Sequence, residues 1–175
     1  MLFIHGAGGF HEDQVMARNL QLHLGDSFQV LMPEMPDADN PGAAAWRDEI
    51  IRQLNALKNP VLVGHSLGGS VLLKLLSEET PPVSIRSLHL LAAPFWSAPD
   101  WNVKEYELAS GFAENLPPEL SIFLYHNEDD EIVPVSHLKR HDDQLPYAIT
   151  RKFKRGGHQF RYHLSAVARD IKNSL

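Results

Sequence analysis

Cysteine is absent from this chain of 175 residues. Disulfide bonds, thiolate zinc sites and a thiol nucleophile are therefore excluded. The chain also lacks a long hydrophobic run, because no stretch approaches the ~20 consecutive apolar residues that a membrane-spanning helix needs. Its first residues, 1–6, contain neither a basic region nor a long apolar segment. We therefore expect no signal peptide, no membrane anchor and a cytoplasmic location.

Positive charge is not in excess either. The formal net charge is −6, and acidic and basic residues are interspersed. This balance argues against nucleic acid or an anionic membrane as the main partner. Internal repeats, low-complexity tracts and linkers are also missing, and domains usually contain ~100–200 residues. The sequence therefore predicts a single domain over residues 1–175.

What the sequence does contain is a regular alternation of short apolar runs and amphipathic stretches. The runs are rich in Val, Ile, Leu and Phe, which is typical of parallel strands buried on both faces. Strands and helices that alternate in this way predict βαβ units and an open parallel sheet with helices on both faces. The predicted strands are 2–5, 28–32, 60–64, 85–92, 121–125 and 148–153, and the predicted helices are 12–24, 41–57, 70–79, 134–144 and 162–173. In the first of these helices, Val15, Met16, Leu20 and Leu24 are expected near one buried face.

One long segment, 94–118, interrupts this alternation. It contains Trp96, Trp101, Tyr106 and Phe112 but shows only weak periodicity. A segment of this length between two strands is usually functional or forms a small subdomain. We interpret it as a short lid, with a packed surface excursion as the alternative.

The strongest motif is Gly64-His65-Ser66-Leu67-Gly68, which follows an apolar run and precedes a helical pattern. In a strand–turn–helix context, G-x-S-x-G is a nucleophile elbow, a tight turn that exposes a strained serine above the sheet. Glycines at 64 and 68 avoid side-chain collisions across that turn. The N-terminus of the following helix offers free N–H groups to developing negative charge. Ser66 is therefore the predicted nucleophile, and an idle serine in a tight turn is the alternative.

Stabilisation of an oxyanion needs two backbone N–H donors. One is expected from Leu67, the residue after the predicted nucleophile, and the other from the Gly-rich loop 5–9, where we assign it to Ala7. A phosphate-binding loop is the competing interpretation, but this segment lacks the P-loop lysine and the full dinucleotide-binding spacing. His5 and His65 flank the pocket loops, and we expect both to shape these loops rather than to donate protons.

The base is expected late in the chain, because the fold that carries this elbow orders its residues serine, acid, histidine. His158 follows two glycines between the last predicted strand and the last predicted helix, and His163 is a weaker candidate. The acid is expected after strand 121–125, where residues 128–131 are all acidic. The spacing Asp-x-x-Val-Pro favours Asp130, with Asp129 as the alternative. An aspartate buried there would orient the imidazole and stabilise its protonated form.

Two other patterns raise the question of a metal site. The acidic residues 128–131 are not at the spacing of a calcium-binding loop. His137 and His141 stand four apart, as a zinc pair on a helix does, but they have basic neighbours and no evident third ligand. We therefore interpret them as solvated helix histidines and expect no metal.

With these residues in place, the chain resembles the α/β-hydrolase superfamily over essentially its whole length. More narrowly, it is similar to the small serine hydrolases of the retinoblastoma-binding-protein-9 type. That likeness rests on the early Gly-rich loop, the stretch 32–37 before a Trp46-containing helix, the elbow at Ser66, and the Asp130 and His158 segments.

The resemblance implies an α/β-hydrolase fold with a Ser66–Asp130–His158 triad and no cofactor. Most members of the superfamily carry two further strands before the loop at His5 and Gly6, and this chain has no residues for them. The resemblance therefore implies about six parallel strands in the local order 2-1-3-4-5-6, with helices on both faces.

The predicted activity is hydrolysis of small carboxylic esters, amides or thioesters through an acyl-enzyme intermediate. The expected partner is this small-molecule substrate, in a modest pocket to which His5, His65, Phe95 and Trp96 contribute. Two alternatives remain open. One is a non-catalytic protein-binding module on the same fold, and the other is acyl transfer to an alcohol instead of water.

Overall fold

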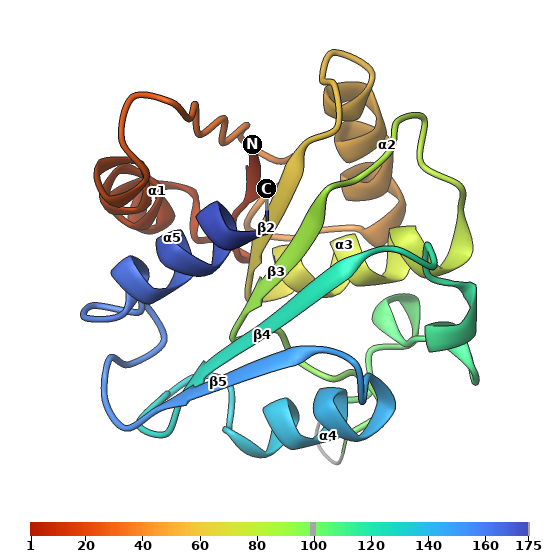
Figure 1. Cartoon of the computed structure of the whole chain (residues 1–175). Helices are drawn as coiled ribbons and strands as arrows, with labels where there is room; N and C mark the ends of the chain where they lie inside the picture. Colours follow the sequence, from red (N-terminus) through yellow and green to blue (C-terminus); the bar gives the residue numbers. More distant parts are fainter. Residues whose placement is uncertain (99–100, 175) are drawn as a thin grey trace.

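A parallel sheet forms the centre of the molecule (Figure 1). The computed structural model describes residues 1–98 and 101–174, and five strands within them form one sheet in the order β1-β2-β3-β4-β5. Neighbouring strands are parallel throughout, so their carboxyl ends lie along the same edge. The strands are β1 (Leu2–Ile4), β2 (Val61–His65), β3 (Ser87–Leu91), β4 (Ser121–Asn127) and β5 (Ile149–Phe153).

The predicted strand 28–32 is wrong, so the sheet has five described strands rather than six. Only Leu31 pairs with β1: its N–H donates to the carbonyl of Met1 at 3.0 Å, and the N–H of Phe3 donates to its carbonyl at 2.8 Å. The segment thus lies beside β1, where the order 2-1-3 put it. Its other backbone groups bond elsewhere, because the Gln21 side chain binds the carbonyl of residue 28 and the N–H of residue 30.

Helices cover both faces of the sheet, as the sequence predicted (Figure 1). On one face lie α1 (Phe10–Leu24) and α5 (Leu164–Asn173), and on the other lie α2 (Ala43–Leu54), α3 (Leu67–Glu78) and α4 (Ser136–Gln144). Within the described residues, none of these helices has the length and apolar content needed to cross a bilayer.

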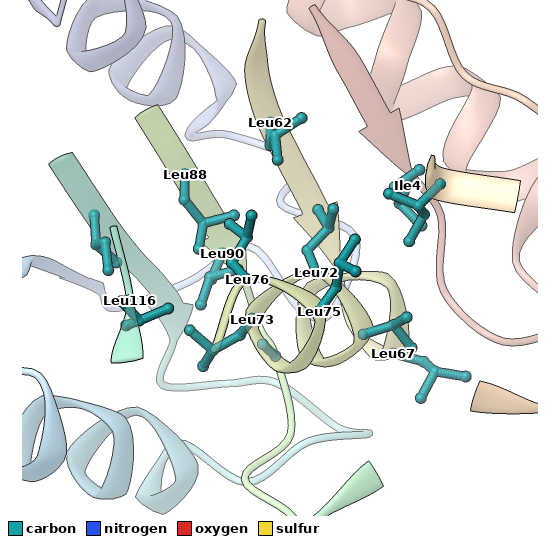
Figure 2. Close-up of a cluster of buried hydrophobic side chains, with 14 of the residues drawn as sticks. Ile4, Leu62, Leu67, Leu72, Leu73, Leu75, Leu76, Leu88, Leu90 and Leu116 are labelled. Atoms are coloured by element: carbon teal, nitrogen blue, oxygen red, sulfur yellow. The ribbon is translucent and has the colours of Figure 1, made fainter. Parts of the chain in front are cut away.

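Two apolar cores flank the sheet because successive strand residues point to opposite faces. Phe3 packs with α1 and α5, whereas Leu2 and Ile4 pack with α2 and α3. Helix α3 is buried almost all round, as expected for a helix that is apolar on every side. Figure 2 shows its leucines Leu72, Leu75 and Leu76 near Leu62 of β2 and Leu88 and Leu90 of β3.

Helix α1 buries a different face from the predicted one. Met16, Leu20 and Leu24 are buried, but Val15 is 58% exposed. The buried row instead begins with Asp13, which is 0% exposed. Residue 15 lies about 100° around the helix from residue 16, at 3.6 residues per turn, so it falls outside the row that includes residues 13, 16, 20 and 24.

The segment 94–118 packs on the same side as α3. It contains two short 3₁₀ helices, η1 (Lys104–Tyr106) and η2 (Phe112–Asn115), and both Tyr106 and Phe112 belong to the core on that side. Its residues 99–100 lie outside the described part of the chain. A lid role for this segment stays a prediction.

The turn between β2 and α3 depends on three glycines. Ser66 sits in it with φ 50° and ψ −124°, a region that side-chain-bearing residues rarely adopt. A Cβ at Gly64 would overlap the backbone of Gly69, and one at Gly69 would lie 2.9 Å from the Cβ of Ala93. A Cβ at Gly68 would overlap the carbonyl oxygens at the end of β1, a contact with another strand rather than across the turn.

Gly68→Ala should therefore unfold the protein more easily. The added methyl meets backbone atoms that cannot rotate away, so we expect a loss of more than about 2 kcal/mol. The matched control is Gly42→Ala, where no atom lies within 4 Å of the added Cβ and the change should cost no more than about 1 kcal/mol. Urea denaturation measures both variants. Equal midpoints would contradict the close packing of α3 against β1.

Candidate active site

The carboxyl ends of the strands gather the predicted site residues around a cavity of about 370 Å³. Loops after β1, β2, β3 and β5 all contribute to its wall, which is the usual location of ligands in parallel α/β sheets. Of the residues predicted from sequence, those that line it are Ala7, His65, Ser66, Leu67, Trp96 and His158.

His5 and Phe95, which were expected in the pocket, do not line this cavity. His5 is buried below the loop, where Nδ1 donates to the carbonyl of Gly6 at 2.7 Å and Nε2 accepts from the N–H of Met35 at 3.0 Å. Burial lowers the pKa of His5. Its role is to shape the Gly-rich loop. Phe95 instead packs edge-on against His141, with ring centroids 5.1 Å apart.

The Ser66 hydroxyl is free of intramolecular hydrogen bonds among the described residues. A serine at the N-cap, immediately before a helix, ordinarily accepts a hydrogen bond from an N–H in the first turn, but Ser66 makes no such side-chain cap. Its backbone is held instead: the N–H donates to the carbonyl of Leu91 at 2.8 Å, and its carbonyl accepts from the N–H groups of Gly69 and Ser70. A fixed backbone with an unused hydroxyl suits a nucleophile.

His158 contacts Asp130 through both carboxylate oxygens. Its Nδ1 donates to Oδ2 at 2.9 Å and to Oδ1 at 3.1 Å. Burial opposes ionisation of Asp130, but hydrogen bonds from His126 and His158 outweigh it and hold the pKa of Asp130 well below its usual range. The carboxylate therefore stays charged. With Nδ1–H bound to it, the other ring nitrogen of a neutral His158 carries a lone pair and can accept a proton.

The two acidic residues next to Asp130 accept hydrogen bonds from the backbone of the loop that carries His158. Asp129, the alternative acid, accepts from the N–H groups of Gly156 and Gly157 rather than from His158. Glu131 accepts from the N–H of His158 at 3.2 Å. His163, the weaker base candidate, donates to the carbonyl of Arg155 and does not line the cavity.

The two predicted oxyanion donors border the cavity together. The N–H of Ala7 has no acceptor among the described residues. Leu67 is the first residue of α3, and the first N–H groups of a helix have no intrahelical acceptor. Gly6, the residue before Ala7, packs closely against Ser66, because a Cβ on it would lie 3.1 Å from that of Ser66. Ala7, Ser66 and Leu67 thus line one cavity, and the oxyanion role of the two N–H groups stays a prediction.

Sequence reasoning missed Asp13, whose carboxylate is buried in the wall of this cavity and bonds to His65 at 2.7 Å. The signal was present, because Asp13 occupies the helical row of Met16, Leu20 and Leu24. An acid on an otherwise apolar face is buried only with a partner. The remaining lining residues are Gly6, Gly9, Glu12, Asp13, Pro41, Pro94, Trp101, Tyr106, Ile132 and Gln159.

His137 and His141 are not solvated, contrary to the interpretation from sequence. Both are 3% exposed. His137 accepts from the N–H of Phe95 at 2.8 Å, and His141 donates to the carbonyl of Ala93 at 3.2 Å. Burial lowers the pKa of each to about 4. Through these hydrogen bonds, the two histidines hold the backbone around the start of segment 94–118 against α4. The described residues contain no group of three acidic or histidine side chains able to hold a metal ion.

Known proteins share this architecture. The ydeN gene product of Bacillus subtilis superposes with a TM-score of 0.78 at 21% identity, over 99% of this chain and 96% of that one. Esterase Est1E of Butyrivibrio proteoclasticus gives 0.74 at 17% identity, over 98% and 84%. The meta-cleavage product hydrolase CumD of Pseudomonas fluorescens gives 0.79 at 15% identity, over 99% and 89%. At these identities the likeness shows the fold alone.

Comparison of the sequence with known proteins and with family models shows to which family the chain belongs. Among curated proteins, none matches this chain. A family model described as the alpha/beta hydrolase family matches residues 1–128. That range includes the Gly-rich loop, the elbow at Ser66 and four of the five strands. The chain belongs to the alpha/beta hydrolase family.

Proposed function

We propose that the protein is a serine hydrolase that cleaves small carboxylic esters, amides or thioesters. The observation that carries this proposal is that a strained Ser66, whose hydroxyl makes no cap, lines the same cavity as His158, and that the ring of His158 is hydrogen-bonded to Asp130. Membership of the alpha/beta hydrolase family supports it. An activated serine needs an adjacent base that is itself oriented by a third group, and Asp130 holds His158 in that way.

In the proposed reaction, His158 takes the Ser66 proton as Oγ attacks the substrate carbonyl carbon. The N–H groups of Ala7 and Leu67 hold the oxyanion that forms. His158 then gives its proton to the leaving group, and the acyl group stays on Oγ. A water molecule, deprotonated by His158, attacks the acyl-enzyme and releases the carboxylic acid with Ser66 restored. Asp130 stabilises the imidazolium at both stages.

The shape of the cavity favours a small substrate. Its volume of about 370 Å³ lies near the lower end of the ~300–1,000 Å³ that ligand pockets usually have. Trp96, Trp101 and Tyr106 line the cavity. The ring of Trp96 contacts the other two rings, whose centroids are 5.4 and 5.0 Å from its own. A short acyl chain or a flat aromatic group fits such a wall better than a long lipid does.

The narrower family is also part of the proposal. The stretch 32–37, the Gly-rich loop and the Asp130 and His158 segments support a place near the small hydrolases of the retinoblastoma-binding-protein-9 type. A small-molecule substrate, no cofactor and a cytoplasmic location are proposed with it.

Ser66→Ala should lower turnover of a short ester such as p-nitrophenyl acetate by roughly 10⁴- to 10⁶-fold. A fluorophosphonate probe should label the wild-type protein at Ser66, as mapped by peptide mass spectrometry. His158→Ala should abolish labelling as well, because the serine then lacks its base. A loss of turnover below tenfold would overturn the assignment. If the folded wild type neither labels nor cleaves any of a panel of esters and amides, a binding module on this fold becomes the better reading.

Asp130→Asn should lower kcat by about 10⁴-fold, as expected when a catalytic imidazole is held in the wrong tautomer. Oδ1 of Asp130 accepts from the N–H groups of Ile132 and Val133 at 2.9 and 2.8 Å. The asparagine oxygen would keep those bonds, so its NH₂ would donate to Nδ1 of His158. This favours the tautomer protonated at Nε2, which cannot accept the Ser66 proton.

The matched control is Asp129→Asn, which changes the adjacent carboxylate that does not contact His158. Its loss of kcat should be far smaller, and ester hydrolysis at saturating substrate measures both variants. A larger loss in Asp129→Asn than in Asp130→Asn would mean that the acid has been misassigned.

A further inference from the structure

A second aspartate–histidine pair is buried in the wall of the cavity. Asp13 is in the first turn of α1 and His65 is the last residue of β2, immediately before Ser66. Their side chains are 0% and 2% exposed, and Oδ2 of Asp13 lies 2.7 Å from Nδ1 of His65. The proposed reaction assigns no role to either group, so a buried pair in this position needs its own explanation.

Both ring nitrogens of His65 face acceptors. Nδ1 faces the Asp13 carboxylate, and Nε2 lies 3.0 Å from the backbone carbonyl of His158. A carbonyl oxygen can only accept, and a neutral imidazole has only one N–H. In a neutral ring that donates to Asp13 through Nδ1, the lone pair of Nε2 would face the carbonyl oxygen of His158, and the two would repel each other. When Asp13 is ionised, both nitrogens of His65 must donate, and His65 is then an imidazolium paired with a carboxylate.

The electrostatic environment agrees with this assignment. Burial alone would lower the pKa of His65, but the charge and hydrogen bond of Asp13 and the carbonyl of His158 raise it above its ordinary value. Burial alone would raise the pKa of Asp13, but His65 and the N–H of Gly6 keep it below its ordinary value. Both shifts favour the charged pair.

This pair ties together the three segments that the proposed reaction needs. Oδ2 of Asp13 also accepts from the N–H of Gly6 at 2.8 Å, the residue before the proposed donor Ala7. His65 is covalently next to Ser66. Nε2 of His65 holds the carbonyl of His158, and the N–H of His158 is held from the other side by Glu131. The backbone of the proposed base is thus fixed on both sides of its Cα.

We propose that Asp13 and an imidazolium His65 are positioning residues, which lock the loops of Ala7, Ser66 and His158 into one geometry. The inference rests on the proposed hydrolase function. Asp130 fixes the orientation of the His158 ring, and His65 fixes the position of the His158 backbone carbonyl. Displacements of about 1 Å in a catalytic group can lower rates by about a hundredfold, so loosening this anchor should lower kcat although both side chains are almost completely buried.

Asp13→Asn tests the anchor with the smallest change in shape. The amide oxygen can still accept from Gly6, but it cannot stabilise a charged His65. We expect kcat for the short ester to fall at least tenfold and KM to change less than twofold. The labelling rate with the fluorophosphonate probe should fall in parallel, because both reactions need Ser66 and His158 aligned.

Asp170→Asn is the matched control. Asp170 is also a buried helical aspartate, 3% exposed, and it pairs with Arg151 and Tyr125 on β5 and β4. The substitution should destabilise the fold to a similar extent in thermal melts but leave kcat within twofold of the wild type. A merely structural role of Asp13 predicts that the two variants behave alike, and that result would overturn the proposal.

The pH dependence of kcat separates a positioning role from a merely structural one, because a loss of packing alone does not shift it. The charged groups facing His65 are Asp13 from α1, Asp130 from the loop after β4, and the ionisable rings of His5 and His158. Because the pKa of His65 is raised, the anchor is present at lower pH and is lost as pH rises through that value. Asp13→Asn should shift this alkaline fall of kcat to lower pH, and an unshifted profile counts against the proposal.

Histidine-selective ¹⁵N NMR of the full chain tests the charge directly. The His65 resonances, assigned by their loss in His65→Gln, should show both nitrogens protonated at neutral pH in the wild type and one in Asp13→Asn. A neutral His65 in the wild type overturns the proposal.

His65→Gln also serves as a conservative replacement, since its amide can still donate to the carbonyl of His158. It should therefore retain more activity than His65→Ala when both fold, as judged by thermal melts. If neither variant folds, the kcat of Asp13→Asn and the ¹⁵N NMR spectrum of the wild type test the proposal instead. Wild-type protein that does not label with the probe overturns the hydrolase function itself. Normal labelling that Asp13→Asn leaves unchanged overturns only the positioning role.

Discussion

The tight junction between β2 and α3 is the constraint on which the site depends. The start of α3 lies so close to the end of β1 that residue 68 has no room for a side chain. Ser66 lies in the same turn with a positive φ, and its hydroxyl is next to the Gly-rich loop that follows β1. Ser66, the start of α3 and this loop therefore belong to one packing arrangement, which is stabilised by the leucines that bury α3 (Figure 2).

Two aspartate–histidine pairs lie around this junction. Asp130 faces the ring of His158. Asp13 faces His65, and the ring centroids of His65 and His158 are 4.5 Å apart. Buried charges are tolerated only when they are paired and hydrogen-bonded, and each carboxylate here also accepts from backbone N–H groups. Such pairs fix loop geometry at least as much as they contribute to stability.

Several segments near the cavity contribute to more than one part of the structure. A single segment, 94–118, supplies both the aromatic wall of the cavity and part of the core beside α3. His137 and His141 attach its beginning to α4. The acidic residues 129–131 likewise act as a group, with Asp129 and Glu131 holding the backbone of the His158 loop while Asp130 meets its ring. Most polar residues near the cavity thus serve to position a neighbour.

By itself the sequence determined the alternation of strands and helices and the elbow around Ser66, because apolar periodicity and glycine spacing act over a few residues. It did not determine that residues 28–32 form a single bridge, since the Gln21 side chain competes for their backbone groups. Only the tertiary structure decided which of four adjacent acids faces His158, and that Asp13 is buried against His65. These contacts join residues 28 and 52 positions apart, and no local pattern encodes such a distance.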